Sequence, residues 1–285
     1  MDRKTFLKSA GTIVLGSMAL GADAMNLASE PGRESAPASR KKYDFPIYDL
    51  HIHRSDSLSA DDIVRKSKES GFESVGIMQN VAPWGIQSDE DLQRFIDEVK
   101  DYPCYMGLQP AQPGWSKNLS KDLIDQVDYV LMDPQYMPDG NKYGDRMELW
   151  EHTCYVDDEE DFMQRSMEWY MKILAHKKER LDILGWPLFL PPCIARDYYR
   201  LWTVERQEQI IEAARDGKVA IEINDLAHTP HPEFILRAKK AGLKFTFGSD
   251  TRDHRSFRLD YCKEVASLCG LTEKDFYVPS RKRRR

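Results

Sequence analysis

From residue 45 onward, the sequence alternates short apolar runs with longer segments of helical periodicity. This alternation is typical of a parallel sheet, because consecutive parallel strands are joined by a crossover that is usually a helix. Seven strand–helix units are expected, with strands at residues 46–52, 74–78, 104–108, 127–132, within 181–190, 219–223 and 245–247. Such crossovers are nearly always right-handed, so seven in succession predict an α/β fold that closes into a distorted (β/α)7 TIM-like barrel.

An open, doubly wound sheet is the competing architecture. It is disfavoured because the turn after the first strand lacks a glycine-rich phosphate loop. Several helix starts carry local signals: Ser59 and Thr203 are placed to act as N-caps, and Pro232 suits a first helical turn. A charged amphipathic helix is expected at about 157–180, after a long polar connection, and a last helix at 256–268.

The composition is that of a globular protein with a sizeable core, since 41% of the 285 residues are hydrophobic and 31% are charged. The sequence contains no run of 18 apolar residues for a membrane span. Its five cysteines form no CxxC pair, which argues against a zinc knuckle or a disulfide framework.

Both ends of the chain differ from its middle. Residues 1–24 combine early basic residues, a mildly apolar run and small residues at the end, which predicts an export signal of the twin-arginine-like type and a periplasmic location. An amphipathic terminus of a cytosolic protein is the alternative. Residues 25–42 read as a disordered linker, residues 43–280 as a single barrel domain, and residues 281–285 as a solvated basic tail.

The net charge of −6 is the sum of segments whose charges differ in sign. Residues 1–24 carry +1 and residues 281–285 carry +5, which leaves −12 for residues 25–280. An acidic body attracts a cation rather than a polyanion, so nucleic acid is not expected as a partner.

Two histidines stand at the end of the first predicted strand. His51 and His53 are two residues apart, so both side chains point to the same side of the strand. The carboxyl ends of barrel strands meet at one mouth, and two imidazoles there can share a cation. A buried histidine bonded to a backbone carbonyl is the alternative interpretation.

Asp250 directly follows the last predicted strand. Closure of the barrel brings that strand beside the first one, so we expect Asp250 to lie near His51 and His53. Two imidazoles and a carboxylate with open positions form a plausible site for one divalent ion. Asp250 could instead cap the loop that follows it.

The other strand ends carry mostly amides and aromatic residues, which suit hydrogen bonding and stacking of a hydroxyl-rich ligand. The candidates for substrate binding are Gln79, Asn80, Gln109, Gln135, Trp186, Asn224 and Arg54. Asp250, Arg252 and His254 are the candidate catalytic residues, and Arg252, His254 or Arg54 could neutralise or protonate an anionic leaving group. His228 and His231 could reach the mouth of the barrel, but a structural role at a helix start is favoured for both.

At these motifs the sequence resembles the PHP family, the polymerase and histidinol phosphatase superfamily of metal-dependent phosphoesterases. The resemblance rests on residues 48–53 (YDLHIH), 221–224 (IEIN) and 245–250 (FTFGSD), and it covers most of residues 45–275. It implies a distorted seven-unit barrel, with His51, His53 and Asp250 as ligands of one metal.

Several positions depart from the pattern of the family. The family usually has metal ligands where Gln79, Asn80, Gln109, Trp186 and Arg252 stand, and a histidine near Gln135. Loss of the bridging carboxylate removes the group that holds two ions close together. The resemblance therefore implies a reduced site with a single metal, in place of two or three.

The sequence is compatible with two functions. The first is an exported PHP-like hydrolase, of phosphoesterase type, with one divalent ion (Zn, Mn or Fe) and a small phosphorylated substrate. The second is a degenerate barrel that binds a polyhydroxylated, carbohydrate-like ligand without metal-dependent hydrolysis. In that case Trp84, Trp115 or Trp186 would provide stacking faces.

Overall fold

The computed structural model describes residues 43–175 and 178–282, and in this part seven parallel strands close into a barrel. Their order around the barrel is β1-β2-β3-β4-β7-β8-β9, and Asp49 of β1 pairs with Phe247 of β9 at the closure. The strands are β1 (Tyr48–His53), β2 (Ser74–Val81), β3 (Tyr105–Pro110), β4 (Tyr129–Met132), β7 (Ile183–Leu184), β8 (Ala220–Asn224) and β9 (Phe245–Gly248). The predicted seven-stranded α/β barrel is thus confirmed.

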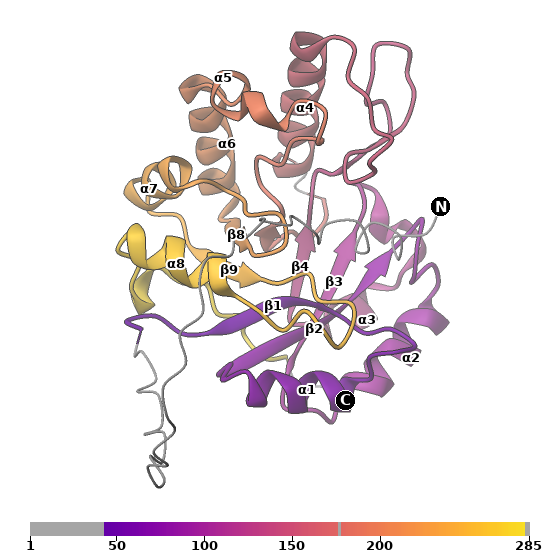
Figure 1. Cartoon of the computed structure of the whole chain (residues 1–285). Coiled ribbons are helices and arrows are strands. Elements are labelled where there is room, and N and C mark those ends of the chain that lie inside the picture. Colours follow the sequence, from indigo (N-terminus) through magenta and orange to yellow (C-terminus); the bar gives the residue numbers. More distant parts are fainter. Residues whose placement is uncertain (1–42, 176–177, 283–285) are drawn as a thin grey trace, which may run out of the picture. The chain divides into compact units, whose positions relative to one another are not determined.

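Helices pack around these strands, with α1 and α2 on one side and α4 and α6 on the opposite side (Figure 1). The helices are α1 (Ala60–Glu69), α2 (Asp89–Val99), α3 (Lys121–Ile124), α4 (Glu159–Leu174), α5 (Tyr198–Leu201), α6 (Val204–Gly217), α7 (Pro232–Lys240) and α8 (Asp260–Leu268). The predicted caps are present: the hydroxyl of Ser59 accepts a hydrogen bond from the backbone N–H of Asp62, and that of Thr203 from Arg206. None of the helices within the described ranges is long and apolar enough to cross a bilayer.

Two helices are shorter than predicted. The helix expected at 157–180 ends at Leu174, because Arg180 instead leads into β7: its guanidinium donates to the carbonyl oxygen of Val127 at 2.9 Å and pairs with Asp182 at 2.7 Å. The helix expected from residue 256 begins at Asp260, since the carbonyl of Ser256 accepts a hydrogen bond from Thr251 Oγ1 at 2.9 Å.

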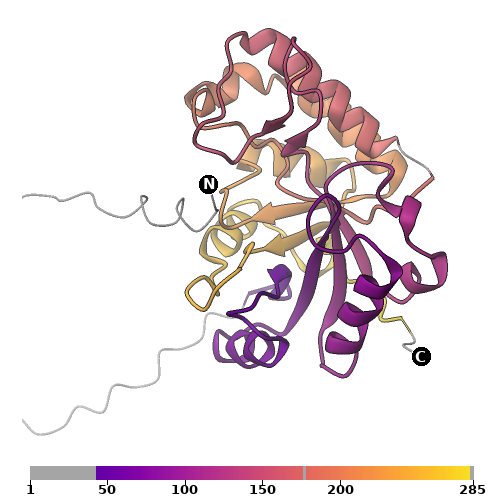
Figure 2. The same cartoon turned by 90° about the vertical axis from the view of Figure 1, so that its right-hand side faces the viewer.

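The polar connection after β4 contains a small antiparallel hairpin that the sequence did not predict. Its strands are β5 (Tyr136–Met137) and β6 (Met147–Glu148), and it lies beside α4 (Figure 2). The side chain of Asn141 accepts hydrogen bonds from the backbone N–H groups of Tyr143 and Asp145, which holds the turn between the two strands.

The predicted export signal, the linker and residues 283–285 of the basic tail lie outside the described residues. The first two residues of the tail contact the start of β3 and the residue before β4. The guanidinium of Arg281 lies 5.2 Å from the ring centre of Tyr105, and the backbone N–H of Lys282 donates to Asp128 at 2.6 Å.

The barrel interior is filled around Tyr129, which is fully buried and donates a hydrogen bond to the carbonyl oxygen of Leu50 at 2.7 Å. Gly76 and Gly107 face its ring, and a methyl group at either glycine would overlap it. The same cluster contains side chains of β1, β2, β3, β4, β7 and β8, namely Leu50, Met78, Tyr105, Leu131, Ile183 and Ala220. This packing fills the barrel below its mouth, so a candidate site is expected at the carboxyl ends of the strands.

Candidate metal site at the mouth of the barrel

A β-bulge in β1 points the two histidines into the barrel. Asp49 pairs with Val75 and Ile52 pairs with Ile77, so β1 has one residue more than β2 over this stretch. Leu50 packs in the interior cluster, and the next residue, His51, also contacts side chains of β3 and β8. Bulges of this kind often re-aim side chains next to active sites.

His51, His53 and Asp250 converge at the mouth, as the sequence predicts. One ligand atom of each lies within 4.8 Å of the other two, and all three residues are buried. Asp250 Oδ1 is 3.5 Å from His51 Nε2 and 3.6 Å from His53 Nε2. Two imidazole nitrogens and one carboxylate oxygen at this spacing could bind a divalent ion and leave coordination positions open.

Glu222 orients His51 from the opposite ring nitrogen. Its Oε1 lies 2.6 Å from His51 Nδ1, and both side chains are completely buried. Because a carboxylate only accepts, Nδ1 carries a proton, and Nε2 is the atom of His51 that faces the site and would bind a metal ion once it has lost its own proton. Burial opposes a charge on His51, but Glu222 and Asp250 outweigh it and raise the pKa of the imidazole to about 9.

The sequence assigned no role to Glu222, although it offered a signal. Glu222 is the single acid in the apolar run Ile221–Ile223, and a charged residue inside a buried strand requires partners. Its second oxygen accepts hydrogen bonds from the backbone N–H of Trp186 at 2.8 Å and from Asn224 Nδ2 at 3.1 Å. Trp186 and Asn224, predicted to bind substrate, therefore hold the carboxylate that orients His51.

The backbone next to the histidines is arranged to admit these contacts. A methyl group on Gly248 would overlap Glu222 Oε1 and lie 2.8 Å from His51 Cβ, so only glycine fits there. Asp250 adopts a left-handed conformation with φ of 49°, which costs energy for a residue with a side chain. Asp49 Oδ1 accepts from the N–H groups of His51 and Ser249, each at 3.1 Å, while burial raises the pKa of its carboxyl to about 6.

A chain of amides borders the histidines on the side of β2 and β3. Asn80 Nδ2 donates to Gln109 Oε1 at 2.8 Å, and Gln109 Nε2 lies 3.2 Å from His51 Nε2 and 2.5 Å from Asp133 Oδ2. Asp133 follows β4 directly, and sequence reasoning missed it in favour of Gln135. The position immediately after the strand was the signal that could have identified it. Gln79 lies next to this chain and accepts from the N–H of Asn80.

Arg252 contacts two of the three candidate metal ligands. Its Nε is 2.8 Å from Asp250 Oδ1, and its Nη2 is 2.8 Å from His53 Nε2. A third nitrogen, Nη1, lies 3.4 Å from Asn80 Oδ1. The predicted site residue Arg252 is therefore part of the cluster, and its side chain remains 27% exposed.

The structure places the other predicted residues apart from this cluster. Arg54 turns towards α2 and pairs with Glu98 at 2.7 Å. His254 is exposed, and its carbonyl accepts from Lys66 of α1. Gln135 is buried, and its amide has no hydrogen-bond partner among the described residues.

The three tryptophans proposed as stacking faces differ in exposure. Trp115 and Trp186 are each only 5% exposed, so neither offers a free face; Trp115 packs in the main core and Trp186 against Phe189. Trp84 is 39% exposed and meets Tyr136 and Trp150 edge to face, with ring centres 5.2 and 5.8 Å away.

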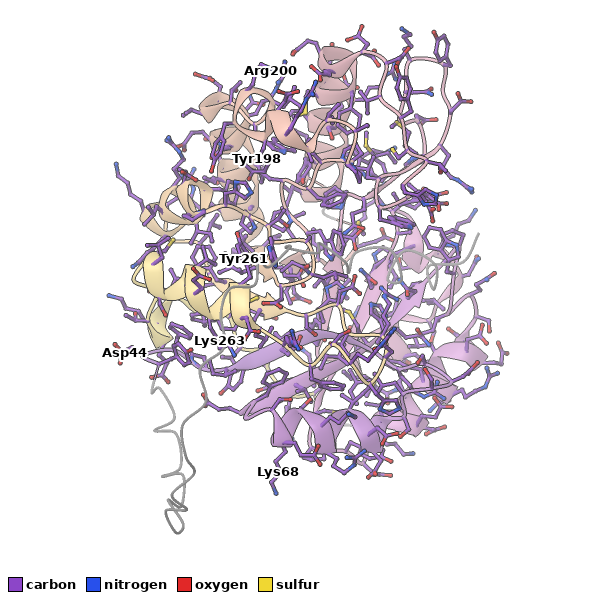
Figure 3. The ribbon with its side chains drawn as sticks, in the orientation of Figure 1. Asp44, Lys68, Tyr198, Arg200, Tyr261 and Lys263 are labelled. Atoms are coloured by element: carbon purple, nitrogen blue, oxygen red, sulfur yellow. The ribbon has the colours of Figure 1, made fainter. Side chains whose placement is uncertain are left out.

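His228 and His231 each stack on a tyrosine. The ring centre of His231 lies 3.8 Å from that of Tyr198, and the centre of His228 lies 4.7 Å from that of Tyr261. Figure 3 shows Tyr198 and Tyr261 in the part of the molecule formed by α5, α7 and α8. These contacts agree with the structural role that the sequence favoured for both histidines.

No family model matches the chain, and no curated protein is significantly similar to it. Among solved structures, the catalytic domain of a mannanase from Streptomyces sp. SirexAA-E is 13% identical, covering 85% of this chain and 83% of that one, with a TM-score of 0.40. Orotidine 5'-monophosphate decarboxylase from Methanocaldococcus jannaschii is 12% identical over 81% and 87%, with a TM-score of 0.37. A chain of archaeal ribonuclease P with mature tRNA is 15% identical over 79% and 83%, with a TM-score of 0.38. At these scores the likenesses carry no argument about function, and the fold assignment rests on the strand pairing of the chain itself.

Proposed function

We propose that the protein is a hydrolase that uses one divalent metal ion, held by His51, His53 and Asp250, to cleave a phosphoester or a related bond. The observation that carries the proposal is the convergence of these three buried ligands, with Glu222 bonded to the far nitrogen of His51. The sequence resemblance to the PHP family supports a phosphoester as the substrate class.

The donor set fits a divalent transition metal. Neutral imidazoles suit zinc and iron, and a carboxylate oxygen also suits manganese, so Zn, Mn and Fe are the candidates. A carboxylate behind a ligating imidazole fixes its tautomer and increases its basicity, which is the role of Glu222 here. Bound at such a site, a divalent ion lowers the pKa of water and polarises a phosphoryl oxygen.

The surrounding side chains would handle protons and negative charge. Asp133 is half-buried, and it is linked to His51 Nε2 through Gln109, so it is the candidate general base. Gln109 and Asn80 provide neutral hydrogen bonds that orient the substrate. Arg252 provides the positive charge for an oxyanion.

Metal analysis of the purified protein tests the proposal. We expect about one divalent ion per chain, lost in His51→Ala and His53→Ala and retained in the control His152→Ala, whose side chain is exposed. Hydrolysis of a generic phosphomonoester should be lost with the metal and restored by adding it back. A metal-free protein whose thermal stability is unaffected by chelators would rule out this function.

The second candidate is binding of a polyhydroxylated, carbohydrate-like ligand without metal-dependent hydrolysis. The observation in its favour is the exposed ring of Trp84, in the loop after β2, which lies beside Tyr136 of β5 and Trp150 after β6. Quenching of tryptophan fluorescence by an oligosaccharide panel, lost in Trp84→Ala, would support this function over the first.

We further propose that residues 1–24 direct export and that the mature protein is periplasmic. The basic, mildly apolar and small-residue order of this segment supports the proposal. N-terminal sequencing of protein from a native extract tests it, because a chain that still begins at Met1 contradicts cleavage. The acidic balance of residues 25–280 supports a small-molecule substrate rather than nucleic acid.

A further inference from the structure

The guanidinium of Arg252 lies against the atoms that would hold the metal. Nη2 is 2.8 Å from His53 Nε2, and Nε is 2.8 Å from Asp250 Oδ1. Both acceptors belong to the buried group of candidate ligands. A permanent cation of the chain is thus bonded to two of the three groups on which the proposed metal site depends.

His53 cannot accept the hydrogen bond from Arg252 and bind a metal ion simultaneously. A guanidinium nitrogen can only donate, so His53 Nε2 accepts this bond through its lone pair. An imidazole nitrogen has a single lone pair, which is also the one that binds a metal ion. Asp250 Oδ1 has more than one lone pair and could keep its bond to Arg252, but His53 cannot serve both cations.

The exposure of Arg252 allows its side chain to move away from His53 and Asp250. Its side chain is 27% exposed, whereas those of His53 and Asp250 are 2% and 4% exposed. The contact of its Nη1 with Asn80 Oδ1, at 3.4 Å, is long for a hydrogen bond. Rotation of the side chain towards solvent would free both acceptors without moving the barrel.

We propose, on the basis of the proposed metal site, that Arg252 is a built-in competitor of the divalent ion and a sensor of an oxyanion substrate. The guanidinium and the metal ion bind the same atom, His53 Nε2, and their binding is mutually exclusive. When the ion displaces it, Arg252 stays at the edge of the mouth, where a tetrahedral oxyanion provides a new bidentate partner. Metal and oxyanion therefore bind cooperatively, because each favours the state in which Arg252 has left His53.

Titration of Mn²⁺ into chelator-treated full-length protein tests this inference, with the free ion followed by its electron paramagnetic resonance signal. Replacing Arg252 by Ala should tighten Mn²⁺ binding about tenfold or more, since a charge-assisted hydrogen bond no longer competes. Arg255→Ala is the matched control, because Arg255 lies three residues on, is 70% exposed and pairs with Asp253. Its Mn²⁺ affinity should stay within about twofold of the unmodified protein.

A second experiment measures how oxyanion binding changes the affinity for Mn²⁺. The Mn²⁺ titration is repeated in sulfate, which serves as the oxyanion probe, and in chloride at the same ionic strength. Sulfate should raise the Mn²⁺ affinity of the unmodified protein and of Arg255→Ala several-fold, and leave Arg252→Ala unchanged. If Arg252→Ala does not fold, Arg252→Gln replaces it, since glutamine keeps a donor without the charge. Equal or weaker Mn²⁺ binding after loss of Arg252, or a sulfate effect that survives it, overturns the inference while leaving the metal site in place. No Mn²⁺ binding in any variant overturns the proposed metal site itself.

Discussion

The Nδ1 atom of His51 and the Oε1 atom of Glu222 lie 2.6 Å apart, although the two residues are separated by 171 positions in the sequence. Neither side chain has exposed surface. Each therefore provides the polar partner that lowers the free-energy cost of burying the other. The bond fixes the ring of His51 with Nε2 towards His53 and Asp250. The candidate metal site is therefore organised by a residue that is not itself a ligand.

Glu222→Gln should weaken metal binding by about 10- to 100-fold while retaining the fold, because glutamine keeps the shape but a neutral amide makes His51 a poorer ligand. Titration of Mn²⁺ with a competing chelator measures the change. Glu98→Gln is the control, since Glu98 pairs with Arg54 near the surface. Unchanged affinity in Glu222→Gln would show that the carboxylate does not act on the metal site.

Gly248→Ala should destabilise the protein by about 3 kcal/mol, because the added methyl group overlaps Glu222 Oε1 and crowds His51 Cβ. Urea denaturation followed by circular dichroism measures the loss. Gly242→Ala is the comparison: Gly242 has a φ of +83° but open space around it, so only the backbone cost of about 1 kcal/mol applies. Equal losses in the two variants would contradict the steric argument.

Asp133→Asn should lower kcat about 10²- to 10⁴-fold on a hydrolysed substrate, because the variant has lost the proposed general base. The metal content should not change, since Asp133 is not one of the three proposed ligands and its carboxylate accepts a hydrogen bond from Gln109. Asp139→Asn, at an exposed position in the same polar connection after β4, provides the matched control. Full activity in Asp133→Asn would assign proton transfer to another group.

Tyr129→Phe should lower the free energy of unfolding by about 1 kcal/mol, because the buried hydrogen bond to the carbonyl of Leu50 is lost. Burial raises the pKa of Tyr129 well above its usual value, so the hydroxyl remains a donor at every physiological pH. Tyr143→Phe, at a 72% exposed position, should cost almost nothing in the same urea titration. A neutral effect of Tyr129→Phe would mean that the barrel interior tolerates an unpaired carbonyl.

Local features of the fold were predictable because their causes lie within a few residues. The caps at Ser59 and Thr203 depend on a hydroxyl and a backbone N–H three residues later. The strands follow from apolar runs bounded by polar residues. The lengths of α4 and α8 were not predictable, since distant contacts of Arg180 and Thr251 end or delay these helices.

The sequence alone determined the alternating barrel architecture and the meeting of its first and last strands, which brought His51, His53 and Asp250 together as predicted. Only the tertiary structure decided which side chains support or oppose this group. Glu222 orients His51, Gly248 makes room for both, and Arg252 bonds to the acceptors that a metal would need. These relationships join strands that are far apart in the chain. A hydrogen bond forms only when donor and acceptor are placed to within a few tenths of an ångström, and the periodicity of a sequence does not determine positions with that precision.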